Sequence, residues 1–576
     1  MNKKIAIILS IILLIIVAGF LYIKFNFLKT KDFKPDASKE KSSIDLRPSI
    51  ISKLQQLVKD GSNGLYKLSI EKINPDVFAS KLDVLNASIN IDTAAMLRLD
   101  SLKLLPDDIF TLHFDSLHID GLEFEDLLNK NSIDITAIKL SLPVIHVYHK
   151  LREYNQGERE RNDTLSLYHR IKGQLNKISI GNISIDNGTF IDYDVARGRK
   201  IANLNNIAVR INDVMIDSST QFDTDRFMFA KHSIIDAKNY VLPTPDSLYY
   251  FKTGAISILA EQHKLVLQNV ELVPRYNRKQ FESKLQYRDE MYHIVFPRVT
   301  LNDVDWWALM NREKLIAERA DVEGGLFSIF LDRSLPKNPG IEIDNFPQQH
   351  LMRIPLPVSI INLNLKDVNV SYEEFNPDSK KGATAYFDKI NARVNYASNI
   401  SADIKKHPVA IFSGSAKFMH KIPMSARFTF DLLKYKTGEF TADVHMDTLD
   451  NDVINPIAEP LALFSIKSGK MQQGTAHIKG NNFNSSCKIA IAYSDLHVKP
   501  LKKADESGQL KKKHLTGLFA NVFLIKNENK GKGNELRQPE FSIVRDHHRN
   551  FVNMVWLTIL TGILKTIGVP VKFVIR

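Results

Sequence analysis

Hydrophobic and polar residues alternate along most of this chain. Phe440, Ala442 and Val444, for example, are separated by Thr441 and Asp443. Successive side chains of a strand point to opposite faces, so such a segment forms a strand with one apolar and one wet face. Strands of this kind are typical of antiparallel sheets. The pattern recurs between residues 65 and 500, with short helical stretches between strands, and predicts a mainly β protein.

The alternating segments include an internal repeat. Residues 178–193 resemble residues 358–372, which lie 180 positions later, and residues 117–122 resemble 299–304, which lie 182 positions later. Two separate blocks with nearly the same offset indicate repeated structural units. Units that extend a sheet side by side predict an elongated β-sheet rather than a compact globule.

The N-terminal run of residues 5–23 is apolar, apart from Ser10 and small residues. At ~1.5 Å per helical residue, it matches a hydrocarbon core of ~30 Å. No small-x-small site follows it, which favours a retained transmembrane anchor over the alternative, a cleaved signal peptide. Lysines flank both ends of the run, so its charges leave the topology open. The residues that we expect to contact lipid are Ile5, Ile8, Leu13, Ile16, Phe20 and Ile23.

We expect six segments in all. They are a transmembrane anchor (1–23), a stalk with a short helix (24–64), two β-groove units (65–225 and 247–400), a β-rich distal unit with lysine-rich loops (401–545), and a C-terminal apolar helix and tail (546–576).

Composition narrows the class of protein. The chain has 576 residues, 44% of them hydrophobic, which is typical of a folded chain. Its single cysteine, Cys487, excludes an intramolecular disulfide framework and every cysteine-based zinc cluster. The mean hydropathy of −0.17 is too polar for a protein with many membrane spans.

The distal part carries much of the excess positive charge. The net charge is +12, and nine lysines against three acidic residues between positions 499 and 532 contribute half of it. Solvated loops explain such a run, and attraction to anionic lipid headgroups is the alternative. The apolar segment 551–567 is either a helix that caps the last core or one that rests on a membrane. Our candidate distal membrane contacts are Lys511, Lys512, Lys513, Trp556 and Leu560.

Motifs for catalysis are missing from the sequence. It contains no phosphate-binding loop, no dinucleotide fingerprint, no H-E-x-x-H and no G-x-S-x-G. His146 and His149 would point to opposite faces of a strand, and adjacent histidines such as His547 and His548 are typical of a polar connection. Phe519 and Phe523 in the basic segment look like inward-facing strand residues. We therefore expect no enzyme, no metal or other cofactor, and no nucleic-acid binding.

Several motifs, in this order, resemble a known family. The segments are the anchor followed by Gly64-Leu65-Tyr66, residues 183–193 with 204–209, Tyr372 with 387–394, Asn455-Pro456 with 466–471 and 493–496, and the closing residues 551–562. Together they are similar to the AsmA-like proteins of Gram-negative envelopes, relatives of TamB. Val368 or Asp367 stands where Gly188 is in the first repeat, so we expect that turn to differ.

The resemblance implies a fold and a role. Such proteins are anchored in the inner membrane, with their bulk in the periplasm. They form a long, open, curled antiparallel sheet with an apolar concave face, similar to bridge-like lipid transfer proteins. The implied role is binding or conducting the acyl chains of phospholipids between membranes, with an outer-membrane or envelope protein as partner at the C-terminal end. The alternative is a scaffold or an outer-membrane protein assembly factor that carries no lipid. The candidate groove-lining residues are Ile180, Ile207, Val209, Ile390 and Val394.

Overall fold

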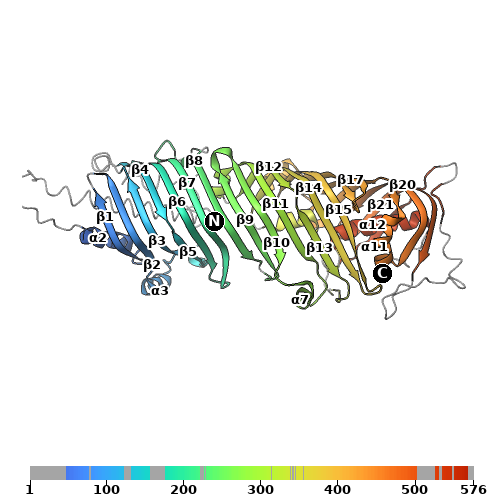
Figure 1. Cartoon of the computed structure of the whole chain (residues 1–576), viewed down its shortest axis with the longest axis horizontal. Helices are drawn as coiled ribbons and strands as arrows, with labels where there is room; N and C mark the ends of the chain where they lie inside the picture. Colours follow the sequence, from blue (N-terminus) through green and yellow to red (C-terminus); the bar gives the residue numbers. More distant parts are fainter. Residues whose placement is uncertain are drawn as a thin grey trace, which may run out of the picture. The chain divides into compact units, whose positions relative to one another are not determined.

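A computed structural model describes twelve stretches of the chain (Figure 1). These are residues 47–76, 79–121, 132–155, 176–220, 229–244, 246–312, 314–337, 345–354, 356–501, 526–530, 535–547 and 550–568, with a few single residues between them. The predicted anchor and Lys511, Lys512 and Lys513 lie outside the described residues. The chain divides into two compact units. The first comprises residues 1–242, 252–267 and 303–314, and the second comprises 243–251, 268–302 and 315–576. The six sequence-based segments stay a prediction.

The first unit is a sheet with short helices. Its elements are α2 (Arg47–Gly61), β1 (Tyr66–Asp76), β2 (Lys81–Ile91), α3 (Thr93–Ser101), β3 (Asp108–Asp120), β4 (Ser132–Ser141), β5 (Val144–His149), η1 (Glu153–Asn155), β6 (Lys177–Asp194), β7 (Arg199–Ile216), β8 (Ala230–Pro243), η2 (Ala260–Gln262) and α8 (Trp306–Arg312). Helix α2 places Leu54 in the apolar core of this unit, together with Leu68 and Ile73 of β1.

The second unit is a longer sheet whose last strands curve around two helices. Its elements are α7 (Arg278–Glu282), β11 (Met291–Val304), β12 (Leu315–Glu323), β13 (Leu326–Asp332), α9 (Pro347–Arg353), β14 (Val358–Asn376), β15 (Lys381–Ser398), α10 (Ser401–Lys406), β16 (Val409–Phe418), β17 (Ile422–Asp431), η3 (Tyr435–Thr437), β18 (Phe440–Met446), β19 (Leu449–Asp450), α11 (Asn451–Ala462), β20 (Phe464–Gly480), β21 (Asn484–Pro500), β22 (Glu540–Val544) and α12 (Phe551–Ile567). Strands β9 (Tyr249–Leu259) and β10 (Lys264–Pro274) pair with each other, and each has residues in both units.

Most neighbouring strands are antiparallel, as predicted. In the second unit, the order β14, β15, β16, β17, β18, β20, β21, β22 is antiparallel throughout. Two places depart from the predicted antiparallel pairing. Strands β4 and β5 run parallel to β6, and β12 and β13 run parallel to β14. Parallel neighbours need a crossover connection, and α9 lies within the one between β13 and β14.

The internal repeat is confirmed as a repeat of strand architecture. In each unit, two short strands in line pair on one side with a long strand, which then forms a hairpin with the next strand. Ile133 of β4 lies opposite Ile178 of β6, and Leu315 of β12 lies opposite Val358 of β14. The offsets between these corresponding residues are the 182 and 180 positions seen in the sequence.

The turn that we expected to differ between the repeats is the same β-bulge in both. The ladder register shifts on either side of Gly188 in β6 and of Val368 in β14. The left-handed backbone falls one residue earlier, at Asn187 (φ 52°) and Asp367 (φ 54°). Asn and Asp tolerate this conformation better than other side chains do. Val368 can therefore replace Gly188, because its own backbone is ordinary.

The bulge allows a stability prediction. We expect Asp367→Val to lower the free energy of unfolding by ~1–2 kcal/mol, because a β-branched residue is strained at positive φ. Asp367→Gly should lower the free energy of unfolding by at most a few tenths of that amount. Lys366→Val is the matched control, since Lys366 is also exposed but has ordinary backbone angles. Urea unfolding of the purified variants measures the differences. Equal losses for the two valine variants would contradict the argument.

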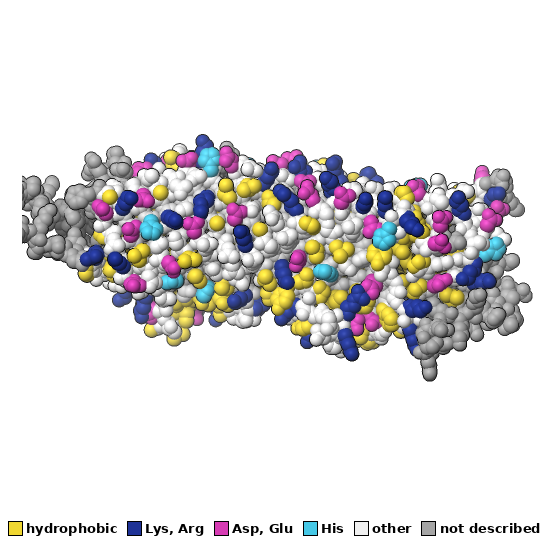
Figure 2. Space-filling view, viewed as in Figure 1, with side chains coloured by type: hydrophobic (Ala, Val, Ile, Leu, Met, Phe, Trp, Pro, Cys, Tyr) yellow, Lys and Arg dark blue, Asp and Glu magenta, His cyan; other side chains and the backbone are white. Residues whose placement is uncertain are grey.

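The wet faces of the strands carry mixed charges. On the face shown in Figure 2, acidic and basic side chains are interspersed over the strands. Lys81 lies 3.3 Å from Asp120 in the first unit, and Arg319 lies 2.9 Å from Asp321 on β12 in the second. The alternating polar positions of the sequence thus face solvent. Of the helices in the described residues, none has the length and apolar character needed to cross a membrane.

Candidate functional site

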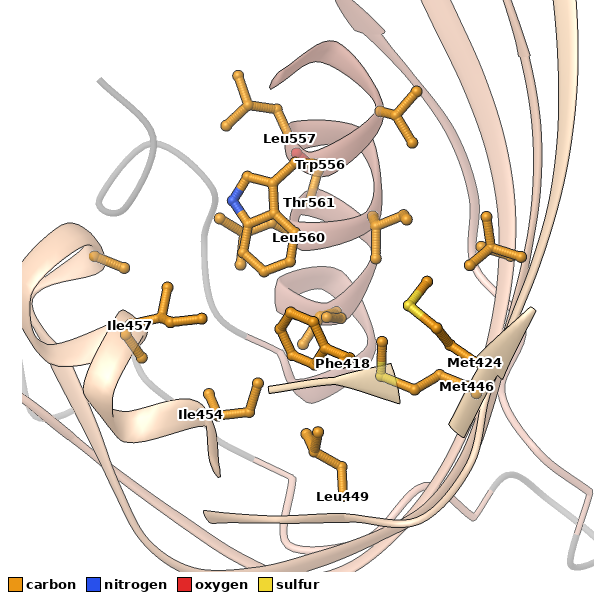
Figure 3. Close-up of a pocket in the computed structure, with 18 of the residues that line it drawn as sticks. Phe418, Met424, Met446, Leu449, Ile454, Ile457, Trp556, Leu557, Leu560 and Thr561 are labelled. Atoms are coloured by element: carbon orange, nitrogen blue, oxygen red, sulfur yellow. The ribbon is translucent and has the colours of Figure 1, made fainter. Parts of the chain in front are cut away.

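The second unit contains a large apolar cavity between its curved sheet and the helices α11 and α12 (Figure 3). Its volume is about 1630 Å³. This exceeds the ~300–1,000 Å³ of ordinary small-molecule pockets. The strand residues in Figure 3 are Phe418, Met424, Met446 and Leu449; those from the helices are Ile454, Ile457, Trp556, Leu557, Leu560 and Thr561.

The alternation of the strands makes the cavity wall apolar. Met424 of β17 lies opposite Met446 of β18, and two positions further along, Ala426 lies opposite Val444. All four line the cavity. Asp443, which precedes Val444 on β18, is outside this lining and contacts the ring of His477 of β20 on the other face of the sheet. The same strands therefore build an apolar concave face and a wet outer face.

Small side chains leave the space for this cavity. Gly414, Ala426, Val444 and Ala476 are successive cross-strand neighbours on β16, β17, β18 and β20, and all four line the cavity. A Cβ on Gly414 would come within 2.6 Å of the Cβ of Ala392 on the neighbouring strand. Larger residues across this row would bring the sheet side chains into the volume that is now open.

Helix α12 packs on the sheet with one side and faces the cavity with the other. The Asn550 side chain caps it by accepting a hydrogen bond from the Asn553 N–H, and Gly568 ends it with a φ of 83°. A Cβ on Gly562 would lie 2.8 Å from Ile489 of β21, so glycine allows the close approach. Trp556, a candidate membrane contact, lies on the cavity side. The helix is apolar almost all round because both of its sides are enclosed.

Helix α11 closes another side of the cavity. The Asn455 side chain holds it to β20 with two hydrogen bonds, donating to the Ile466 carbonyl and accepting from the Ile466 N–H, each 2.8 Å long. Ile454, Ile457 and Leu461 line the cavity at helical spacing. The sequence reasoning missed these three residues. Their i, i+3, i+7 spacing was the available signal, but Pro456 and Pro460 in the same segment argue against a helix.

Charged side chains are a minority of the lining, which includes Asp378, Asp450, Lys470 and Asp546 as well as one ion pair. Arg333, which follows β13, donates to the Glu374 carboxylate of β14 over 3.1 Å, and Glu374 is 5% exposed. Asn376 of β14 donates to the carbonyl of Pro460 in α11. The two charges of this ion pair therefore compensate each other where Glu374 is buried.

The candidate groove residues fall in different places. Ile390 of β15 lines the cavity, while Val394 on the same strand is half-buried outside the described lining. Ile180 and Val209 are buried in the core of the first unit, and Ile207 packs against that core. Leu560 points into the cavity with Trp556 (Figure 3). A direct membrane contact of Trp556 and Leu560 stays a prediction.

The residues with catalytic potential are dispersed. His149 contacts Asp108 (2.6 Å), while the ring of His146 packs edge-on against Tyr148 and Tyr193. His547 lies against the Phe483 ring, and His548 is outside the described residues. Within the described stretches, no cluster of three or more His, Cys, Asp or Glu could hold a metal ion.

Cys487 is the single cysteine of the chain, and it is enclosed by the core beside α12. Its side chain is 1% exposed, and burial raises the pKa of its thiol to about 12. The thiolate is the nucleophilic form of cysteine, and at neutral pH this thiol is protonated. Cys487 therefore acts as a small apolar residue that packs between β20 and β22.

Comparison with known proteins adds no functional information. Neither a protein-family model nor a curated protein matches the sequence. A solved structure titled "Crystal structure of Sex pheromone staph-cAM373 precursor" is 9% identical, and the match covers 62% of this chain and 96% of that one. Its TM-score is 0.11, which is too low to carry an argument about the fold or the function.

Proposed function

We propose that this protein binds or conducts the acyl chains of phospholipids in an apolar β-groove. The observation that carries the proposal is the cavity of about 1630 Å³ in the second unit, whose walls are mostly apolar side chains. Exposing an acyl chain to water costs ~0.8 kcal/mol per methylene group, which is roughly 12 kcal/mol for a sixteen-carbon chain. An apolar cavity removes most of this cost.

The proposal extends to the location of the protein. In it, residues 1–23 anchor the chain in an inner membrane, and the bulk lies in the periplasm, as in the AsmA-like proteins that the sequence resembles. The repeated units form an open, elongated groove, and the distal lysines and the C-terminal helix engage a membrane or an envelope protein partner. The role would be lipid homeostasis of the outer membrane. The apolar N-terminal run, the repeat and the cavity support this reading.

Mass analysis of bound lipid tests the proposal. We expect the full chain, purified in a mild non-phospholipid detergent from the cells that make it, to retain about one or more phospholipids per molecule in native mass spectrometry. A single-span membrane protein treated identically controls for lipid held only by an anchor. A folded chain with no more lipid than this control would contradict the proposal and favour a scaffold or assembly factor that carries no lipid.

A further inference from the structure

Two buried polar atoms of α12 lie in the cavity wall without a hydrogen bond. They are Oδ1 of Asn553 and Oγ1 of Thr561, and neither has a partner among the described residues. The exposed fractions of these residues are 6% and 1%, and both line the cavity. Figure 3 shows Thr561 among the lining side chains. Asn553 lies three residues before Trp556 and seven before Leu560, on the same side of the helix.

The other buried threonines of α12 are satisfied. Thr558 donates to the Met554 carbonyl over 2.7 Å and lies 2.6 Å from the Ser485 hydroxyl of β21. Thr566 donates to the Gly562 carbonyl over 2.7 Å. A helical threonine can usually bond back to the preceding turn in this way. Buried polar groups are nearly always paired, so the exceptions at the cavity point to a missing partner there.

We propose that the acyl lipid in the cavity carries a free hydroxyl group, and that Asn553 and Thr561 are seats for that hydroxyl. This inference rests on the proposed function and names the class of lipid. A hydroxyl both donates and accepts, so it can donate to the Asn553 amide oxygen or exchange a hydrogen bond with Thr561. A hydrocarbon can do neither, and an ester carbonyl can only accept.

The lack of charge on α12 favours an uncharged group beside these two residues. In the described part of the chain, none of the α12 residues that line the cavity is charged. An ionised group beside them would be desolvated without a counter-charge, which is strongly unfavourable. The two seats are eight residues apart, or ~12 Å along the helix, so one hydroxyl occupies one seat at a time.

Paired isomeric probes test the inference. The probes are 1-dodecanol and undecyl methyl ether, which have the same atoms, but only the alcohol has an O–H. We expect the delipidated full chain to bind the alcohol ~5-fold or more tightly than the ether in calorimetric titration, which corresponds to one hydrogen bond. In the double variant, Thr561→Val with Asn553→Leu, this ratio should fall towards one, while binding of the ether is unchanged. Each single variant leaves one seat, so it should lower the ratio only in part.

The controls separate the possible failures. Thr566→Val makes the same change on the same helix away from the cavity lining, and should keep the ratio. If neither probe binds, the proposed function fails. If both bind equally to the unaltered protein, water satisfies the two atoms and the inference is overturned while acyl binding stands. A ratio that survives in the double variant overturns it as well. If Asn553→Leu does not fold, Thr561→Val and the unaltered protein still decide between these results.

Discussion

Ala426→Glu should remove at least nine-tenths of the phospholipid that co-purifies with the full chain. Ala426 of β17 lines the cavity and has Gly414 and Val444 as its cross-strand neighbours, so the new carboxylate would stand in the apolar wall. An ion without a partner loses several kcal/mol when lipid replaces the water around it. Each 1.4 kcal/mol lowers the affinity ~10-fold, so the affinity for phospholipid should fall by more than tenfold. Mass spectrometry of the bound lipid detects a loss of this size.

Ala490→Glu is the matched control for this variant. Ala490 lies on β21 between Ile489 and Ile491, which line the cavity, so its own side chain points to the opposite face of the sheet. It should retain the lipid of the unaltered protein. Circular dichroism and the unfolding temperature must show that both variants are folded. Equal retention of lipid by the two folded variants would mean that the acyl chains lie elsewhere, which would contradict the proposed function of this cavity.

Phe551→Ala should produce the largest loss of stability, ~3–5 kcal/mol in the free energy of unfolding, as for other buried phenylalanines. Phe551 is the first residue of α12 and is 8% exposed. Its ring centroid lies 4.9–5.7 Å from four other phenylalanine rings, and most of these contacts are edge-on or tilted, the arrangement that aromatic pairs favour. The four rings are those of Phe346, Phe428, Phe430 and Phe440. Removing the Phe551 ring leaves a void where α12 joins β17 and β18.

Hydrogen exchange of α12 and its neighbouring strands measures this loss within the second unit, so unfolding of the first unit does not obscure it. Phe483→Ala is the control, because Phe483 is 53% exposed and its ring contacts only the edge of His547 among the described aromatic pairs. Surface substitutions of this kind usually change stability by ~0.5 kcal/mol or less. If Phe551→Ala costs no more than Phe483→Ala, the aromatic cluster does not hold α12 in place.

These two predictions test different properties of one structure. Ala426→Glu changes the wall of the cavity, and Phe551→Ala changes the attachment of the helix that closes it. A cavity that holds lipid should lose its ligand in the first variant without unfolding. In the second variant, the loss of α12 would lower both stability and lipid retention, and added phospholipid should recover part of the stability because ligand binds only the folded state.

The strand character of the chain and its repeat were predictable from local patterns. A period of two identifies a strand with one apolar face, as in 440–446, whatever the strand pairs with. Asn187 and Asp367 show the limit of this reasoning. The sequence comparison aligned Gly188 with Val368 and predicted a different turn, but the left-handed residue is the one before, which only the backbone geometry reveals.

The strand directions and the cavity could not be predicted without the tertiary structure. Half-buried strands alternate in the same way in parallel and antiparallel pairs, so nothing in 132–149 or 315–332 announces parallel pairing with the next long strand. Apolar residues also alternate in the same way whether they fill a core or line a space. Ile180 and Ile390 occupy similar positions in the sequence pattern, yet the first is in a closed core and the second lines the cavity.

The order of residues within short segments was enough to predict a mainly β chain with a repeated unit, an apolar N-terminal run and an apolar C-terminal helix. The position of the cavity follows only from the tertiary structure. The row of small residues comes from β16, β17, β18 and β20, and α11 and α12 complete the enclosure from opposite ends of a segment of more than 100 residues. Such a cavity forms because side chains that are distant in sequence do not fill the volume between them. A local sequence pattern cannot show this.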